Sequence, residues 1–144
     1  MIRVIGVLLA AGLLLGACGS ISASKALTSW VVQSGYLSTA KSLTNDAQRS
    51  ANALNIASTT NVDLHTVCAV LDLETEQANS SLPTPDNQAT SLLSKAYTNI
   101  GAGASECYGA AANVAKRAKA LHSLTSGVSD LAEASARIAS ASTP

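Results

Sequence analysis

LPTPD, residues 82–86, is the stretch that divides this chain of 144 residues into two helical parts. Two prolines one residue apart remove backbone N–H donors and disfavour the helical conformation at the residues before them. Asp86 stands where a carboxylate can accept from the first free N–H groups of a new helix. We therefore expect one helix to end near Ser80 and the next to begin at Asp86.

Upstream of this turn, apolar residues recur at three- and four-residue steps over 25–57 and 62–80, which predicts two amphipathic helices. Ser24 is the expected N-cap of the first helix, and the polar cluster 58–61 is expected to end it and cap the second. Gly35 is a weak position in the first helix but not necessarily a break. The inward stripes are predicted to be Val32, Tyr36, Ala40, Leu43, Ala47, Ala51 and Leu54, and then Leu64, Val67, Cys68, Leu71, Thr75, Ala78 and Leu82.

Downstream of the turn, the same periodicity predicts a helix that passes through 101–103 and stops at Gly109, a residue type favoured just past a helix end. A last helix is expected over about 110–140, and Gly127 leaves open whether it is split. The inward stripes here are predicted to be Ala89, Leu92, Leu93, Ala96, Ile100, Ala104 and Cys107, and then Val114, Ala118, Leu121, Thr125, Val128, Leu131, Ser135 and Ile138. Four such helices with short loops predict an all-α, up-down-up-down four-helix bundle over residues 26–141.

The N-terminal residues 1–17 have the pattern of a lipoprotein signal peptide. Arg3 precedes a run of 12 apolar residues, Val4 to Leu15, which is too short to span a bilayer and is typical of secretory signals. Residues 15–18, LGAC, resemble a bacterial lipobox, whose cysteine receives a diacylglyceryl group. The alternative is an ordinary signal peptide cut near Ala17, which would leave Cys18 as an unpaired thiol.

Lipidation at Cys18 predicts a protein held on the extracytoplasmic face of the cell membrane, with residues 18–25 as the lipidated tether. Two acyl chains give durable anchoring where one is marginal. Without Arg3 the chain has eight Lys and Arg against nine Asp and Glu, a formal charge of −1. This balance argues against nucleic acid as a partner.

Cys68 and Cys107 remain after Cys18 is assigned to the anchor. Export places them in an oxidising compartment, where such a pair usually forms a disulfide. In antiparallel helices joined by the proline turn they reach similar heights, within about one and a half turns. Two free thiols are the alternative. A metal site is disfavoured because neither cysteine has a C-x-x-C partner and His65 alone does not complete a ligand set.

Several segments in this order resemble a pattern of uncharacterised secreted helical proteins and lipoproteins of actinobacteria. The segments are Cys68–Asp72, Leu82–Asp86, Leu92–Tyr97 and Ala104–Ala110, within about residues 64–132. The shared pattern is C-x-x-L, then P-x-P-D, then a second cysteine followed by Gly-Ala. Where that family usually has tryptophan after the turn, this chain has Leu92 or Leu93. The resemblance implies an exported helical domain with a Cys68–Cys107 bridge, and it implies no known activity.

The polar residues do not assemble into a catalytic motif, so we expect no enzyme and no cofactor. His65 and His122 are the only histidines, and neither has a nucleophile or metal motif beside it. The acidic residues of 72–76 and the basic residues of 116–119 are interpreted as solvated helix faces. Cation binding by the first group and contact of the second with an anionic partner are the alternatives.

Trp30, Gly101 and Gly103 are the candidates for a pocket or an interface. Trp30 is interpreted as the cap of the bundle end, with a membrane interface or a pocket rim as alternatives. The sequence as a whole predicts a non-enzymatic, membrane-anchored scaffold that binds another protein of the cell envelope. The alternative is a small-molecule or lipid-binding module with a pocket between helices, which a cavity beside Trp30 or Gly103 would favour.

Overall fold

The computed structural model describes residues 22–143, and these residues form helices and no strands, which confirms the all-α prediction. The predicted signal peptide, Cys18 and half of the predicted tether lie outside the described residues. The helices are α1 (Ala23–Gln33), α2 (Tyr36–Asn55), α3 (Asn61–Asn79), α4 (Asn87–Tyr108) and α5 (Val114–Ser142).

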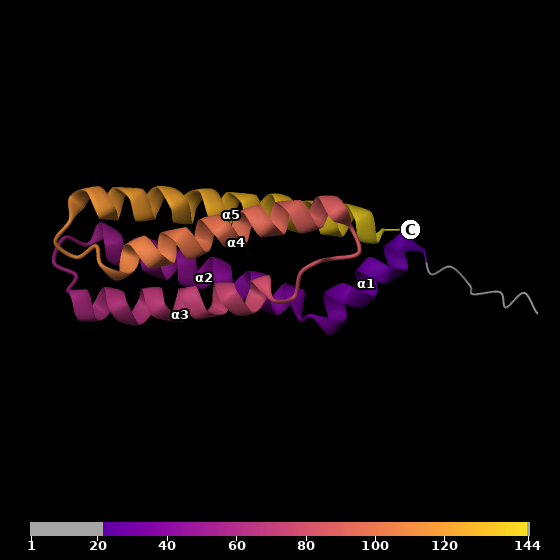
Figure 1. Cartoon of the computed structure of the whole chain (residues 1–144), viewed down its shortest axis with the longest axis horizontal. Helices are drawn as coiled ribbons and strands as arrows, with labels where there is room; N and C mark the ends of the chain where they lie inside the picture. The colour runs from indigo at the N-terminus through magenta and orange to yellow at the C-terminus, as the bar shows by residue number, and fades with distance from the viewer. Residues whose placement is uncertain (1–21, 144) are drawn as a thin grey trace, which may run out of the picture.

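The four longer helices lie side by side along the length of the molecule (Figure 1). α4 packs against α5 and α3, and α2 packs against α3 and α5. The loops from α2 to α3 and from α4 to α5 lie at the same end, which we call the distal tip (residues 56–62 and 108–114). α1 and the end of α5 lie at the opposite end of the molecule (Figure 1).

The prediction of a single helix over 25–57 was wrong, because Gly35 separates α1 from α2. Gly35 has φ 64°, a left-handed conformation that glycine adopts without steric cost. The hydroxyl of Ser34 donates to the carbonyl of Trp30 at 2.7 Å and closes α1. α1 also begins earlier than expected, with Ser22 and not Ser24 as its N-cap. The break removes Val32 from the core stripe and leaves it 75% exposed.

The boundaries around the proline turn follow the predictions, whereas the last helix begins at Val114 and not near 110. Asp86 caps α4, and Gly109 ends it. Thr60 caps α3 within the expected polar cluster, in a reciprocal capping box with Asp63. Both α4 and α5 are continuous, so that Gly127 does not split the last helix.

Cys68 and Cys107 form a disulfide between α3 and α4, as predicted. Their Cα atoms lie 5.9 Å apart, and both residues are fully buried. The core around them is built from leucine, alanine and isoleucine, with Tyr36 and Tyr97 also buried.

The predicted inward stripe of the last helix is wrong over its first half. Val114, placed inside by the prediction, is 81% exposed. The buried row of α5 is Arg117, Ala120, Leu124, Gly127, Asp130, Leu131, Ala134 and Ile138. The periodic apolar residues were assigned inward and Arg117 was assigned to the surface, whereas Arg117 lies in the buried row, and this difference shifts the register.

Candidate functional site

The two predicted pocket glycines in α4 do not open a cavity. A Cβ atom on Gly103 would lie 2.7 Å from side-chain atoms of Leu124, so this glycine allows α5 to approach closely. Gly127 has the same role from α5, where a Cβ atom would lie 2.6 Å from Ile100. Gly101 faces α3, and a Cβ atom there would make an ordinary contact with Thr75 at 3.6 Å. Small residues therefore serve packing at these positions.

Trp30 is half-buried at the end of the molecule where α1 meets α2. Its indole N–H donates to the carbonyl of Ser81 at 3.1 Å, and its ring lies 5.5 Å from that of Tyr36. The residue thus packs on the core from α1, and it lies next to residues that line a recess between α2 and α3.

This recess has a volume of about 180 Å³ and is lined mainly by hydroxyl groups. Tyr97 and Tyr36 are both 3% exposed and line it. The Tyr36 hydroxyl is 2.7 Å from the hydroxyl of Ser135. The Tyr97 hydroxyl has no hydrogen-bond partner among the described side chains and main-chain groups. The other lining residues are Ser34, Thr39, Gln77, Ala78, Ser80 and Ser81.

A second depression of about 280 Å³ adjoins the recess and shares Thr39 and Gln77 with it. Glu74 supplies its acidic group, and one carboxylate oxygen accepts from the hydroxyl of Ser42 at 3.0 Å. The other oxygen of Glu74 is buried without a hydrogen-bond partner. We call the recess and this depression together the polar groove. Its second part is lined by Ser38, Thr39, Ser42, Leu43, Glu74 and Gln77.

Burial raises the pKa values of two side chains that line the groove, Glu74 and Tyr97. Burial raises the pKa of Glu74, and the neighbouring carboxylate of Asp46 raises it further, while the Ser42 hydroxyl acts in the opposite direction. Asp46 is itself paired with Arg49 at 2.9 Å. Burial also raises the pKa of the Tyr97 phenol, and the nearby Tyr36 adds to this effect. Tyr97 therefore stays protonated and keeps a hydrogen-bond donor at the groove.

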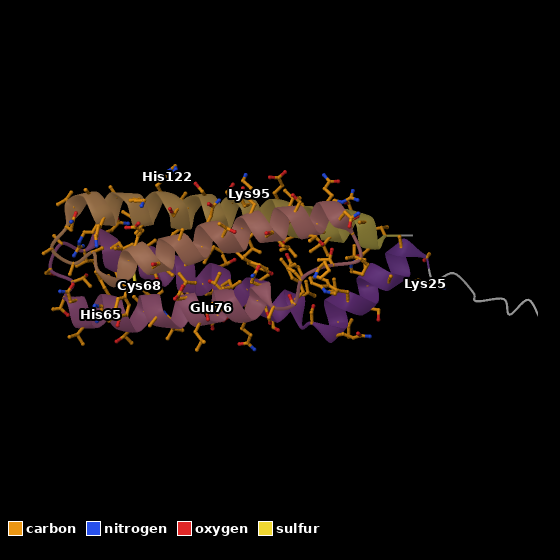
Figure 2. All side chains as sticks on the ribbon, in the orientation of Figure 1. Lys25, His65, Cys68, Glu76, Lys95 and His122 are labelled. Carbon is orange, nitrogen blue, oxygen red and sulfur yellow. A yellow bond between two sulfur atoms is a disulfide. The ribbon has the colours of Figure 1, made fainter. Side chains whose placement is uncertain are left out.

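A further hollow between helices lies beside the disulfide, with a volume of about 370 Å³. Tyr108 lines it and stacks on the ring of His65, with ring centres 3.9 Å apart. His65 is half-buried, and Figure 2 shows it on α3 toward the distal tip, one turn before Cys68. No acid, base or nucleophile is bonded to either ring within the described residues.

The interpretation of 116–119 as a solvated basic face was wrong for Arg117, which is 9% exposed. Its guanidinium donates only to main-chain carbonyls, which belong to the end of α2 and to both loops of the distal tip. The shortest bonds, 2.7 Å each, reach the carbonyls of Leu54 and Ala111. Further bonds reach the carbonyls of Ile56, Thr59 and Ala110. Arg117 thus holds the two loops together.

The interpretation of 72–76 as a solvated acidic face was likewise wrong for Glu74, because its carboxylate turns into the polar groove. Sequence reasoning missed this groove because its polar residues on α2 and α3 lie beside the apolar stripes that were predicted to face inward. The signal was present as polar residues at helical steps, Ser38 and Ser42 on one helix and Glu74 and Gln77 on the next. Such stripes beside the apolar ones can face each other where α2 and α3 pack together.

No protein-family model matches this sequence, and neither the curated proteins nor the solved structures include a match to it. Within residues 22–143, every helix is too short or too polar to cross a lipid bilayer.

Proposed function

We propose that this protein is an exported lipoprotein, anchored through Cys18 to the extracytoplasmic face of the cell membrane. The observation that carries the proposal is the buried Cys68–Cys107 disulfide. A stable disulfide is typical of exported proteins, and this one accounts for two of the three cysteines. Cys18 is thereby the one cysteine outside the bridge, at the end of a lipobox-like segment.

The short distance from Cys18 to α1 supports a scaffold that stands on the membrane. Ser22, the N-cap of α1, follows Cys18 by four residues, which span at most about 14 Å when extended. α5 has 29 residues, and a helix of that length extends for about 43 Å. An anchored molecule would therefore present its distal tip well away from the lipid surface.

The distal tip has the surface character that a protein partner needs. Val62 and Val114 are 74% and 81% exposed, and Ile56 and Tyr108 are also exposed. Grouped apolar side chains on a small protein often mark an interaction site. We therefore propose a non-enzymatic scaffold that binds another component of the cell envelope through this tip, and not a catalyst.

The helix arrangement and the sequence resemblance belong to the same proposal. Helices α2 to α5 pack in a closed order in which each contacts the next and α2 contacts α5. We propose that they form the up-down-up-down four-helix bundle, with α1 as an added helix at the membrane end. We also propose that the chain belongs with the actinobacterial secreted proteins and lipoproteins that share its C-x-x-L, P-x-P-D and C-x-G-A pattern.

A mass spectrum of the protein from its own membrane, alkylated without reduction, tests the anchor and the disulfide together. We expect a chain that begins at Cys18, carries a lipid mass and takes no alkyl group. An unlipidated chain that begins elsewhere would refute the anchor. A photo-crosslinking residue at Val62 or Val114 tests the partner site, and the same residue at Leu37, which is 71% exposed near the opposite end, is its control. Equal capture from both ends would refute recognition by the tip.

A further inference from the structure

We propose that the outward face of α3, with the hollow beside it, binds a basic amphipathic helix of a protein partner. We call this face the α3 stripe, and its members are Val62, Thr66, Ala69, Val70 and Leu73. The proposal rests on the proposed scaffold function and names the chemistry of the partner. Apart from Val62, the stripe lies outside the distal tip, so the two surfaces can be tested separately.

α3 carries apolar side chains on two opposite sides. The buried side packs into the core and consists of Leu64, Cys68, Leu71, Thr75 and Ala78. The α3 stripe lies on the other side, where steps of three and four residues place its members along one line. Of these, Val62 is 74% exposed, Val70 44% and Leu73 67%. A helix that packs on one side normally presents charged and polar residues to solvent, so the stripe has the character of an interaction surface.

The hollow of about 370 Å³ between α3 and α4 lies beside the stripe. Ala69 and Leu73 belong both to the stripe and to the hollow, and Ala104, Ser105 and Tyr108 line the hollow from α4. The small side chains among them leave room, and the ring of Tyr108 is partly exposed. A helix laid along the stripe can insert one of its side chains there, as groove-bound amphipathic helices do.

The charge of the hollow favours a cation on the partner. Asp72 and Glu76 line it one turn apart on α3, and Figure 2 shows Glu76 farther from the distal tip than His65. Within residues 22–143 neither carboxylate forms a salt bridge, and α3 contains no lysine or arginine. A lysine or arginine of the partner can lay its methylene groups on Leu73 and place its charge beside the two carboxylates.

The same charges argue against a second copy of the chain and against a lipid surface. A second copy that used its own α3 stripe would bring no lysine or arginine to Asp72 and Glu76. An anionic membrane would be repelled by both carboxylates. A basic amphipathic helix supplies the opposite charge and an apolar side together.

Fluorescence anisotropy of labelled helical peptides tests the proposal. The stripe extends about 17 Å from Val62 to Leu73 at 1.5 Å per residue, so a peptide of about 14 residues covers it. The basic peptide has leucine on one side and lysine beside it, and the acidic peptide has glutamate in place of each lysine. The full mature chain with Cys18→Ser carries no lipid, so that neither peptide is taken up by detergent or bilayer.

We expect saturable binding of the basic peptide, roughly tenfold or more tighter than that of the acidic peptide. Leu73→Ala should weaken this binding about tenfold, because the stripe loses its largest side chain. Leu37→Ala is the matched control, since Leu37 is 71% exposed on α2 and lies outside the stripe. This variant should bind the basic peptide as the wild type does.

The role of the charges is tested by combining Asp72→Asn with Glu76→Gln. This double variant should lose most of the difference in affinity between the basic and the acidic peptide. Glu133→Gln, at an exposed carboxylate of α5, should keep that difference. Added salt should weaken binding of the basic peptide to the wild type more than to the double variant. Circular dichroism of each variant confirms that it is folded.

Three results with the peptides overturn the proposal: no binding of the basic peptide at about 1 mM, equal binding of both peptides, or equal binding by wild type and Leu73→Ala. A dimer of the chain alone that Leu73→Ala abolishes, seen by analytical ultracentrifugation, would assign the stripe to a second copy and overturn it as well. The lipid mass at Cys18 and crosslinking at Val114 do not depend on Leu73. The anchor, the recognition by the tip and the α3 stripe therefore fail separately.

Discussion

The close packing of α4 on α5 predicts opposite effects for two chemically identical substitutions. Gly127 and Gly101 both lie inside long helices. A Cβ atom at 127 would lie 2.6 Å from Cγ1 of Ile100 and 2.8 Å from its main-chain nitrogen. A Cβ atom at 101 would find Thr75 at 3.6 Å, an ordinary contact distance.

The two magnitudes follow from helix propensity and from crowding. Replacing glycine by alanine inside a helix stabilises it by about 1 kcal/mol. Gly101→Ala should keep most of this gain. At Gly127 the obstruction includes main-chain atoms, which a side-chain rotation cannot move, so the cost should be near the upper end of the 1–3 kcal/mol typical of overpacking. Gly127→Ala should therefore destabilise the protein by about 2 kcal/mol and separate the two variants by about 3 kcal/mol.

Urea unfolding followed by far-ultraviolet circular dichroism measures this difference, with the disulfide intact in all proteins. The dependence of free energy on urea should be the same for wild type and both variants, because the surface exposed on unfolding is unchanged. In thermal unfolding, Gly127→Ala should lower Tm by about 8 °C. If Gly127→Ala were as stable as Gly101→Ala, α4 and α5 would not approach as closely as described and the reasoning would be refuted.

Three further outcomes follow from the disulfide, the buried arginine and the buried carboxylate. Replacing Cys68 and Cys107 together by alanine should lower the free energy of unfolding by about 4 kcal/mol, as calculated for a loop of about 40 residues; an unchanged urea midpoint would contradict this. Arg117→Met should lower the free energy of unfolding by about 3 kcal/mol, because main-chain carbonyls in both tip loops lose their donors. Arg117→Lys should restore part of this stability. Equal stability of the wild type and both variants would show that the guanidinium hydrogen bonds are not needed. The raised pKa of Glu74 means that its contribution is favourable below the unfolded value of 4.5 and is lost as pH rises through the folded pKa. Wild type should thus lose stability relative to Glu74→Gln just above pH 4.5, measured by urea unfolding across that range, and parallel pH profiles would disprove the assignment.

The helix ends and caps could be predicted from the sequence, because each depends on a few neighbouring residues. The proline turn, the cap at Asp86, the stop at Gly109 and the polar cluster before α3 all depend on a few adjacent residues, and the structure confirms each. The prediction that Cys68 pairs with Cys107 used the expected export and the antiparallel helices expected around this turn, and the disulfide itself is confirmed.

The features that the sequence did not disclose depend on distant contacts. The residues next to Gly35 in the sequence do not distinguish it from a glycine inside a continuous helix. Its left-handed conformation reflects how α1 packs on α5 and α2. In the sequence, Arg117 cannot be told apart from the basic surface residues beside it. Only the fold brings the carbonyls of the two loops around its guanidinium. The glycines at 101 and 103 suggested space, but space between helices is set by how closely the backbones approach. The polar groove required two hydroxyl stripes from separate helices to meet.

The bonding of Arg117 bears on how freely the distal tip can change in sequence. Its guanidinium donates hydrogen bonds to main-chain oxygens of the two loops and of the end of α2, and every residue type carries that oxygen. Substitutions in 56–60 and 109–113 can therefore alter the chemistry of the outer surface while the loops keep their shape. The loop sequences of such a tip can therefore diversify, either during evolution alongside a changing partner or in a laboratory library of loop variants.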